Sequence, residues 1–211
     1  MSKTMKTVNI VLQGIGGQGT LTLMEMLAMA AEKAGEEVRV LSRVSLARLG
    51  GSGMCHIRLG PSASPAIPQG EADILVSLEM SEVLRALPLA RPGALAFIHA
   101  YRRLPIATGT TGQHYPTRSE VEEALLARDI HAVFVPEGIA GSGGVIDHAP
   151  RATEDQREHI NIVMLGVLCG YTRILPRPLL EEAISERLPT FAAQNARIFD
   201  AGWRFGELSV I

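Results

Sequence analysis

The stretch VLQGIGGQGTLTL, residues 11–23, places four glycines within six residues directly after an apolar run. The run KTVNIVLQG is apolar, carries β-branched residues and ends in glycine, which predicts a buried strand. From Gly17 to Ala34 apolar residues recur at helical spacing, and Gly35 is placed to end that helix. The segment EVRVLS then predicts a second strand. Strand, glycine-rich turn, helix and strand form the first unit of a doubly wound parallel sheet, with the turn at its carboxyl edge.

The rest of the chain continues this alternation and then changes character. The segments MCHIRLG, ADILVSLE, GALAFIHA and IHAVFVP predict further strands, with a helix from Thr117 to Arg128, giving five or six strands in all. From residue 151 onward three helical patterns follow. We therefore predict a single α/β domain over residues 1–211. It has a doubly wound, mostly parallel, Rossmann-like sheet over about residues 5–150, covered by a C-terminal helical layer over about residues 151–211. The glycine-rich stretch 136–150 is either a mobile connector or a loop that contacts a partner.

The glycine spacing Gly14-x-Gly16-x-x-Gly19 satisfies the dinucleotide-binding fingerprint. That fingerprint also requires an acidic residue near the end of the second strand, to bind the ribose hydroxyls. Here the position offers Ser42 and Arg43, which argues against NAD or FAD, although an arginine can meet a 2′-phosphate or another anion. The alternative is that the glycines only allow tight packing and the close approach of another protein.

A second glycine cluster, ARLGGSGMCHIRLG, follows the second predicted strand and is expected beside the first loop at the same edge. Two glycine-rich loops flanked by Arg43 and Arg48 make a surface suited to an anion. The alternative is a pair of tight turns with solvated arginines. Gln18 favours a structural role for the first loop, because its amide is better suited to fixing a neighbouring loop than to accommodating a phosphate.

Composition excludes several classes of function. A formal net charge of −2 gives no long-range attraction for nucleic acid or an anionic membrane. The most apolar segment, from Ile160 to Cys169, is too short for a membrane span of roughly 20 residues, so we expect a cytoplasmic protein. Cys55 and Cys169 cannot supply the about four ligands of an iron–sulfur cluster or a structural zinc. The six histidines are scattered, and no hydrolase, metalloprotease or P-loop motif is present. We predict neither a catalytic residue nor a metal site on this chain.

Four segments, in this order, resemble the gamma-type domain of the 2-oxoacid:ferredoxin oxidoreductases. They are GIGGQGTLT, RLGGSGMCHIRLG, IPQGEADILVSLE and the C-terminal helices from NIVMLGVLCGYTRILP to NARIFDAGW. The resemblance covers about residues 6–204 and is greatest for the branch that acts on aryl 2-oxoacids. It implies a complex that oxidatively decarboxylates a 2-oxoacid with coenzyme A and ferredoxin. Thiamine diphosphate, magnesium and 4Fe-4S clusters are then expected on a larger (alpha) partner subunit, with this chain as a non-catalytic subunit. Complexes for pyruvate, 2-oxoglutarate or branched-chain oxoacids, and a stand-alone nucleotide- or coenzyme A-binding module, are the alternatives.

The family motif can be carried over residue by residue. Its GxGGQG loop falls on Gly14, Gly16, Gly17, Gln18 and Gly19, and its second-loop Gly-Gly-Ser falls on Gly50, Gly51 and Ser52. The family usually has arginine directly before that Gly-Gly, whereas this chain has Leu49 there and Arg48 one position earlier. These loop residues, with Arg43 and Arg48, are the candidates for contacting coenzyme A or the partner. Asn161 and Asn195 match asparagines of the helical layer and are expected to join helices by hydrogen bonds.

Overall fold

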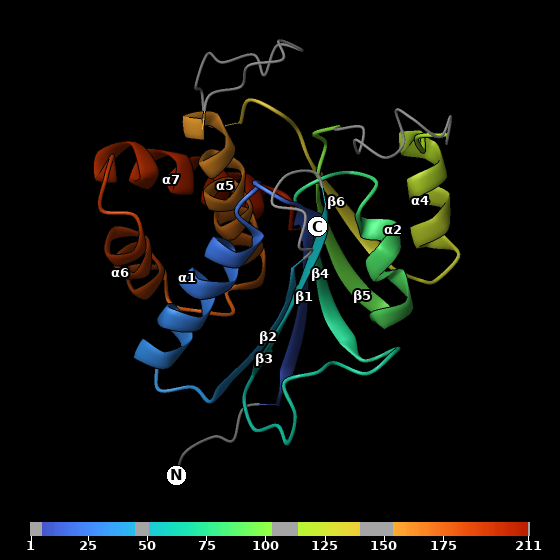
Figure 1. Ribbon diagram of the computed structural model, residues 1–211, viewed down its shortest axis with the longest axis horizontal. Coiled ribbons are helices and arrows are strands. Elements are labelled where there is room, and N and C mark those ends of the chain that lie inside the picture. The colour runs from blue at the N-terminus through green and yellow to red at the C-terminus, as the bar shows by residue number, and fades with distance from the viewer. Residues whose placement is uncertain (1–5, 45–50, 103–113, 140–153, 211) are drawn as a thin grey trace.

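The structure is a computed structural model that describes residues 6–44, 51–102, 114–139 and 154–210. It contains one six-stranded sheet in the order β2-β3-β1-β4-β5-β6 (Figure 1). The strands are β1 Val8–Ile15, β2 Val38–Val44, β3 Ser52–Leu59, β4 Ala72–Ser77, β5 Ala90–His99 and β6 His131–Val135. The helices are α1 Thr20–Lys33, α2 Val83–Ala86, the 3₁₀ turn η1 Leu87–Leu89, α4 Arg118–Leu126, α5 Glu154–Thr172, α6 Arg177–Arg187 and α7 Ala192–Leu208.

The sheet is mostly parallel, as predicted, with one antiparallel strand. β1, β4, β5 and β6 are parallel neighbours, whereas β3 pairs antiparallel with both β1 and β2. β2 therefore runs in the same direction as β1 but is separated from it by β3. The short return from β2 to β3 accounts for this, because antiparallel strands can be joined by a short connection, whereas parallel neighbours need a long crossover. The apolar pattern of β3 does not encode its direction.

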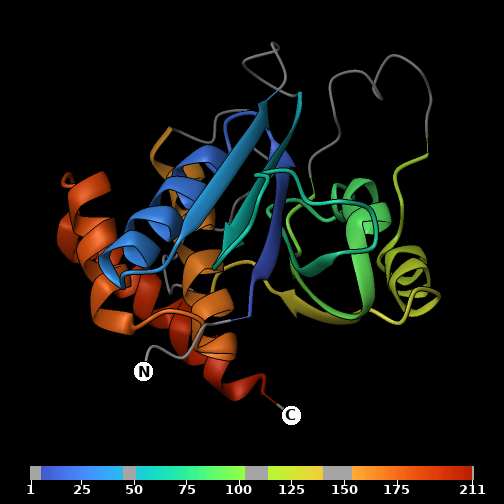
Figure 2. The ribbon, with the colours of Figure 1, turned by 90° about the horizontal axis from the view of Figure 1, so that it is seen from below.

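Helices cover both faces of the sheet (Figures 1 and 2). One buried cluster joins alternate residues of β1, such as Ile10 and Leu12, to the side chains of α1, α5, α6 and α7. The other joins Val11 of the same strand to α2 and α4. Successive side chains of a strand point to opposite faces, so the continuous apolar run of β1 supplies both cores. The C-terminal helices are present as predicted; the single-domain assignment stays a prediction.

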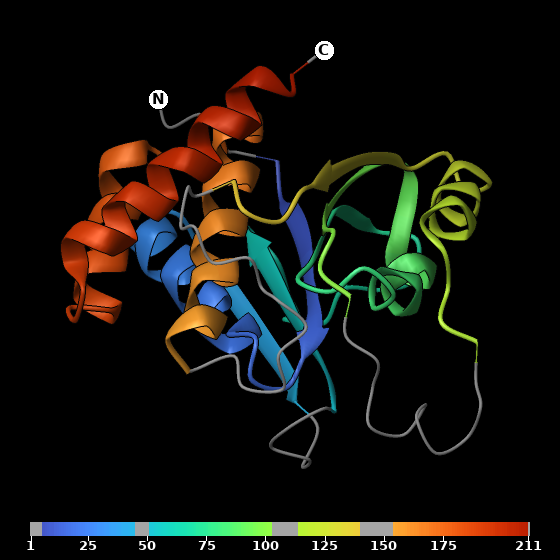
Figure 3. The same ribbon diagram turned by 90° about the horizontal axis from the view of Figure 1, so that it is seen from above.

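α5 and α7 approach each other through glycines and lie across one another (Figure 3). A Cβ at Gly166 would lie 2.5 Å from the Phe199 carbonyl oxygen and 2.7 Å from the Trp203 nitrogen. Gly170, Gly202 and Gly206 are closed in by the facing backbone in the same way. The two helices therefore pack backbone against backbone, which leaves no room for a side chain at these positions.

The termini of two helices follow directly from their residues. Gly35 has a φ of +77° and ends α1, as predicted. At the start of α4, the Thr117 hydroxyl accepts from the Glu120 backbone N–H at 3.3 Å, and the Glu120 carboxylate accepts from the Thr117 N–H at 2.6 Å. The backbone hydrogen bond of this capping box, together with a hydrogen bond to His114, lowers the pKa of the Glu120 carboxyl to about 2.

Candidate functional site

The candidate site lies at the carboxyl ends of β1 and β4. The chain leaves β1 through α1 toward β2, but leaves β4 through α2 toward β5 on the other side. This is the topological switch point at which open α/β sheets bind their ligands. We call the residues gathered there, 14–20, 51–52 and 78–82, the carboxyl edge.

The first glycine loop is a tight turn from β1 into α1. A Cβ at Gly14 would lie 2.6 Å from the Thr20 hydroxyl, and Gly17 and Gly19 have φ of +95° and +80°. At Gly19 an added Cβ would also lie 2.5 Å from the Asn161 amide nitrogen of α5. The shape of the turn alone therefore accounts for glycine at these positions.

Gln18 holds this loop in place, as its amide led us to expect. Its side chain is 2% exposed. Its Oε1 accepts from the Ile15 N–H at 2.7 Å, and its Nε2 donates to the Leu78 carbonyl at 3.1 Å. Gln18 thus bridges the two sides of the crevice between β1 and β4 with its own hydrogen bonds.

The described part of the second glycine cluster, from Gly51, lies beside the first loop, as predicted. The Gly16 N–H donates to the Gly51 carbonyl at 2.7 Å, and Ser52 is the register partner of Ile15. Arg48 and Gly50 lie outside the described residues. Arg43 is exposed near the end of edge strand β2, with β3 between it and the first loop. Of the two arginines expected to flank an anion, only Arg43 is thus described, and it lies two strands away from the first loop.

Sequence analysis missed a polar triad on the inner side of the carboxyl edge. Gln13 Nε2 donates to Ser52 Oγ at 2.7 Å and to Glu82 Oε2 at 2.8 Å. Ser52 Oγ donates to the same Glu82 oxygen at 2.5 Å. Gln13 is a polar residue in an apolar strand, which could have been noticed. Nothing in the sequence connects it with Glu82, which follows β4.

A second buried carboxylate ties the edge to the start of α4. Glu79 is fully buried, and its Oε2 accepts from the Ser81 N–H at 2.8 Å and the Ser81 hydroxyl at 2.6 Å. Its Oε1 accepts from the Tyr115 hydroxyl. Burial, reinforced by the bond to Glu79, raises the pKa of Tyr115, so this phenol stays protonated and donating.

His99 and the two cysteines are buried without ligand geometry. His99 ends β5, its Nδ1 accepts from the Tyr101 N–H at 3.2 Å, and burial lowers its pKa to about 4. Cys55 and Cys169 are fully buried free thiols whose pKa values are raised by burial, which confirms them as small core residues. Within the described ranges, no three His, Cys, Asp or Glu residues are grouped to hold a metal ion. Over the same ranges, no helix is long and apolar enough to cross a membrane.

The two asparagines of the helical layer occupy positions of different kinds. Asn195 Nδ2 donates to the Leu188 and Thr190 carbonyls at 3.1 Å, so it joins α7 to the end of α6 as expected. Asn161 is fully buried where α5 meets the first glycine loop, and its Nδ2 lies 3.5 Å from the Gly19 carbonyl oxygen. Because Gly19 is the N-cap of α1, Asn161 joins α5 to the start of α1, at the first glycine loop.

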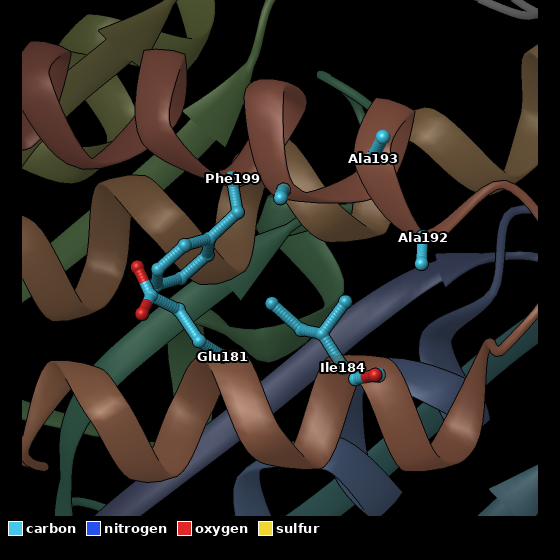
Figure 4. Close-up of a pocket in the computed structure, with 7 residues that line it drawn as sticks. Glu181, Ile184, Ala192, Ala193 and Phe199 are labelled. Atoms are coloured by element: carbon cyan, nitrogen blue, oxygen red, sulfur yellow. The ribbon is translucent and has the colours of Figure 1, made fainter.

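A pocket of about 320 Å³ lies away from these loops, between α6 and α7 (Figure 4). Its lining is mainly apolar, with Ile184, Phe199 and three alanines. The carboxylate of Glu181 is engaged by Arg177 at 2.8 Å. The polar lining residues of the pocket are Glu181 and Ser185.

Comparison with known proteins identifies the family. The model of the pyruvate ferredoxin/flavodoxin oxidoreductase family matches residues 9–205. The chain belongs to this family. It is 31% identical over 205 residues to indolepyruvate oxidoreductase subunit IorB of Thermococcus kodakarensis, covering 94% of this chain and 95% of that protein. It is also 31% identical over 185 residues to the subunit of the same name from Archaeoglobus fulgidus, covering 86% of each. The predicted membership of the 2-oxoacid:ferredoxin oxidoreductases is thereby confirmed.

Solved structures share the fold at low identity. The pyruvate oxidoreductase subunit PORC of Thermotoga maritima matches with a TM-score of 0.63 and 20% identity, over 95% of this chain and 97% of that one. The 2-oxoglutarate:ferredoxin oxidoreductase of Magnetococcus marinus matches with a TM-score of 0.69 and 19% identity, over 97% of this chain and 32% of that one. The α/β architecture of this family member is thus that of family subunits of known structure.

Proposed function

We propose that this chain is the small, non-catalytic subunit of a complex that oxidatively decarboxylates an aryl 2-oxoacid of the indolepyruvate type, with coenzyme A and ferredoxin. The observation that carries the proposal is the 31% identity to subunits named indolepyruvate oxidoreductase subunit IorB, over nearly the full length of both chains. A larger partner subunit would hold thiamine diphosphate, magnesium and the iron–sulfur clusters. This assignment of the clusters to the partner agrees with the two cysteines of this chain, which are both buried and too few to hold a cluster.

The carboxyl edge is the surface that we propose for docking this partner. Its two loops are held together by the Gly16–Gly51 hydrogen bond, and Gln18 fixes them to the segment after β4. A rigid edge suits subunit docking because little conformational entropy is lost on association. We further propose that part of coenzyme A contacts the same edge, through backbone N–H groups of the first loop and through Arg43.

Co-purification tests the proposed function. The full chain is expressed with its large subunit, and the complex is expected to carry thiamine diphosphate and cluster absorbance. It should turn over indolepyruvate faster than pyruvate or 2-oxoglutarate, while this chain alone should show no turnover. Robust activity of the isolated chain, or a preference for pyruvate, would contradict the proposal.

A glycine variant separates docking from coenzyme A binding at the edge. Gly16→Leu should prevent assembly by crowding the contact between the Gly16 and Gly51 backbones. Gly35→Asn, at the other end of α1, should not, because the position has open space around it and asparagine tolerates its left-handed conformation. Coenzyme A should raise the melting temperature of the wild-type chain in proportion to RT ln(1 + [L]/Kd). No shift at millimolar coenzyme A would refute the ligand contact and leave docking as the role of the edge.

A further inference from the structure

The Gln13–Ser52–Glu82 triad directs the hydroxyl hydrogen of Ser52 inward, to the Glu82 carboxylate. A serine hydroxyl has one hydrogen, and that of Ser52 is directed to Glu82 Oε2 at 2.5 Å. Gln13 Nε2 lies within hydrogen-bond distance of both Ser52 Oγ, at 2.7 Å, and Glu82 Oε2, at 2.8 Å, and donates to this pair. Ser52 Oγ keeps one unused lone pair. Toward any additional group, half-buried Ser52 is therefore an acceptor and not a donor.

The same triad contains a buried acceptor that lacks a donor. Gln13 is 1% exposed, and its Oε1 has no hydrogen-bond partner within the described part of the chain. Exchanging the oxygen and nitrogen of this amide would place its oxygen 2.8 Å from a Glu82 carboxylate oxygen, so the assignment of Nε2 as donor is the favourable one. Buried amide oxygens are rarely left unpaired, because the lost interaction with water is not replaced.

The negative charge of Glu82 also favours an N–H donor over an anion at the triad. Glu82 is 3% exposed, and its described cationic neighbour is Arg85, whose side chain is 63% exposed and whose Nε lies 3.2 Å from Glu82 Oε1. A phosphate brought to Ser52 would find no hydroxyl hydrogen and a carboxylate behind it. An N–H donor would find the unused lone pair of Ser52 Oγ. The Gln13 amide that donates to this Oγ also carries the unpaired oxygen.

We propose that this triad recognises an N–H donor of the large subunit, an ammonium, guanidinium or backbone amide, and that Ser52 does not bind phosphate. The inference rests on the proposed function, since it needs a partner at the carboxyl edge. It divides that edge in two. The Gly16 and Gln18 N–H groups are used within the chain, by the Gly51 and Ile15 carbonyls. Arg43 and the remaining N–H groups of the first loop are the candidates to meet an anion, and the Ser52 end meets a donor.

The test measures assembly and coenzyme A use separately in the complex of the full chain with its large subunit. Ser52→Ala removes the acceptor and should weaken subunit association roughly 5- to 20-fold, the effect of one lost hydrogen bond. The KM for coenzyme A should stay within about twofold. Ser52→Thr keeps the hydroxyl and should restore association. Ser209→Ala is the matched control, because the Ser209 hydroxyl also donates a hydrogen bond within the chain, to the Phe205 carbonyl at 2.8 Å, but lies just after α7 and outside the carboxyl edge. It should leave association unchanged.

The outcomes are distinct. If Ser52→Ala raises the KM for coenzyme A while assembly is intact, Ser52 binds the anion and the inference is wrong. If neither quantity changes, the triad only supports its own loop and the inference is equally wrong. A wild-type chain that binds no large subunit contradicts the proposed function, and the inference falls with it.

Discussion

His99 should make the fold sensitive to acid within a defined pH range. Its pKa is about 4 in the folded chain against an ordinary value of 6.5, because burial disfavours the charged imidazolium. The folded state therefore keeps His99 neutral, while the unfolded chain takes up a proton as the pH falls below 6.5. This histidine contributes its full stability above that pH and loses it progressively as the pH falls toward 4. The two pKa values give a loss of about 2 kcal/mol at about pH 5 and about 3 kcal/mol at still lower pH.

Urea unfolding of the wild type and of His99→Asn, from about pH 7.5 to about pH 4.5, measures this contribution. Asparagine offers an oxygen in place of the Nδ1 that accepts from the Tyr101 N–H, so the local hydrogen bond is kept. Any loss of packing in the variant lowers the free energy of unfolding equally at every pH. The contribution of His99 is therefore read from how steeply the free energy of unfolding changes with pH in each protein. The variant should lose about 2.5 kcal/mol less than the wild type across this range. His131→Asn, at an exposed position, is the control and should follow the wild type. Parallel curves for wild type and His99→Asn would refute the reasoning.

Three further variants probe other features. Thr117→Ala removes the capping box of α4 and should lower the free energy of unfolding by about 1 kcal/mol in urea titrations; no change would mean that water replaces the cap. Gly166→Ala forces a methyl group against the Phe199 carbonyl and should cost about 1–3 kcal/mol despite the better helix propensity of alanine; a stabilised variant would contradict the backbone contact. Gln13→Glu places a second carboxylate against Glu82 and should cost about 1–3 kcal/mol at neutral pH. Repulsion raises the pKa of the pair, so part of that loss should return at about pH 5, and a pH-independent loss would exclude this cause.

The elements of the fold were predictable because their residues carry local signals. The apolar run of β1, the glycine turn after it and Gly35 at the end of α1 each depend on neighbours in sequence. The antiparallel direction of β3 was missed, because the apolar pattern of a buried strand does not encode its direction. The available signal was the short connection after β2, which is too short for a crossover to a parallel neighbour.

The candidate site was predictable only in part, for the same reason. The two glycine loops were expected side by side because both follow strands that run in one direction. Gln18 was expected to fix a loop because its amide can both donate and accept. Glu82 and Glu79 gave no local signal, since their roles depend on Gln13 and Tyr115, which lie far away in the chain. Long-range polar contacts of this kind leave no periodic trace in a sequence.

Gln18 gives the first glycine loop a conformation that does not depend on a bound ligand or partner subunit. Its two hydrogen bonds, to Ile15 and Leu78, are made within the chain itself. Whatever meets this edge encounters a turn that is already in its final conformation, so association involves no folding of the turn. The association rate should then be set by diffusion and orientation. Contacts at the carboxyl edge should mainly change the dissociation rate, and so the lifetime of the complex.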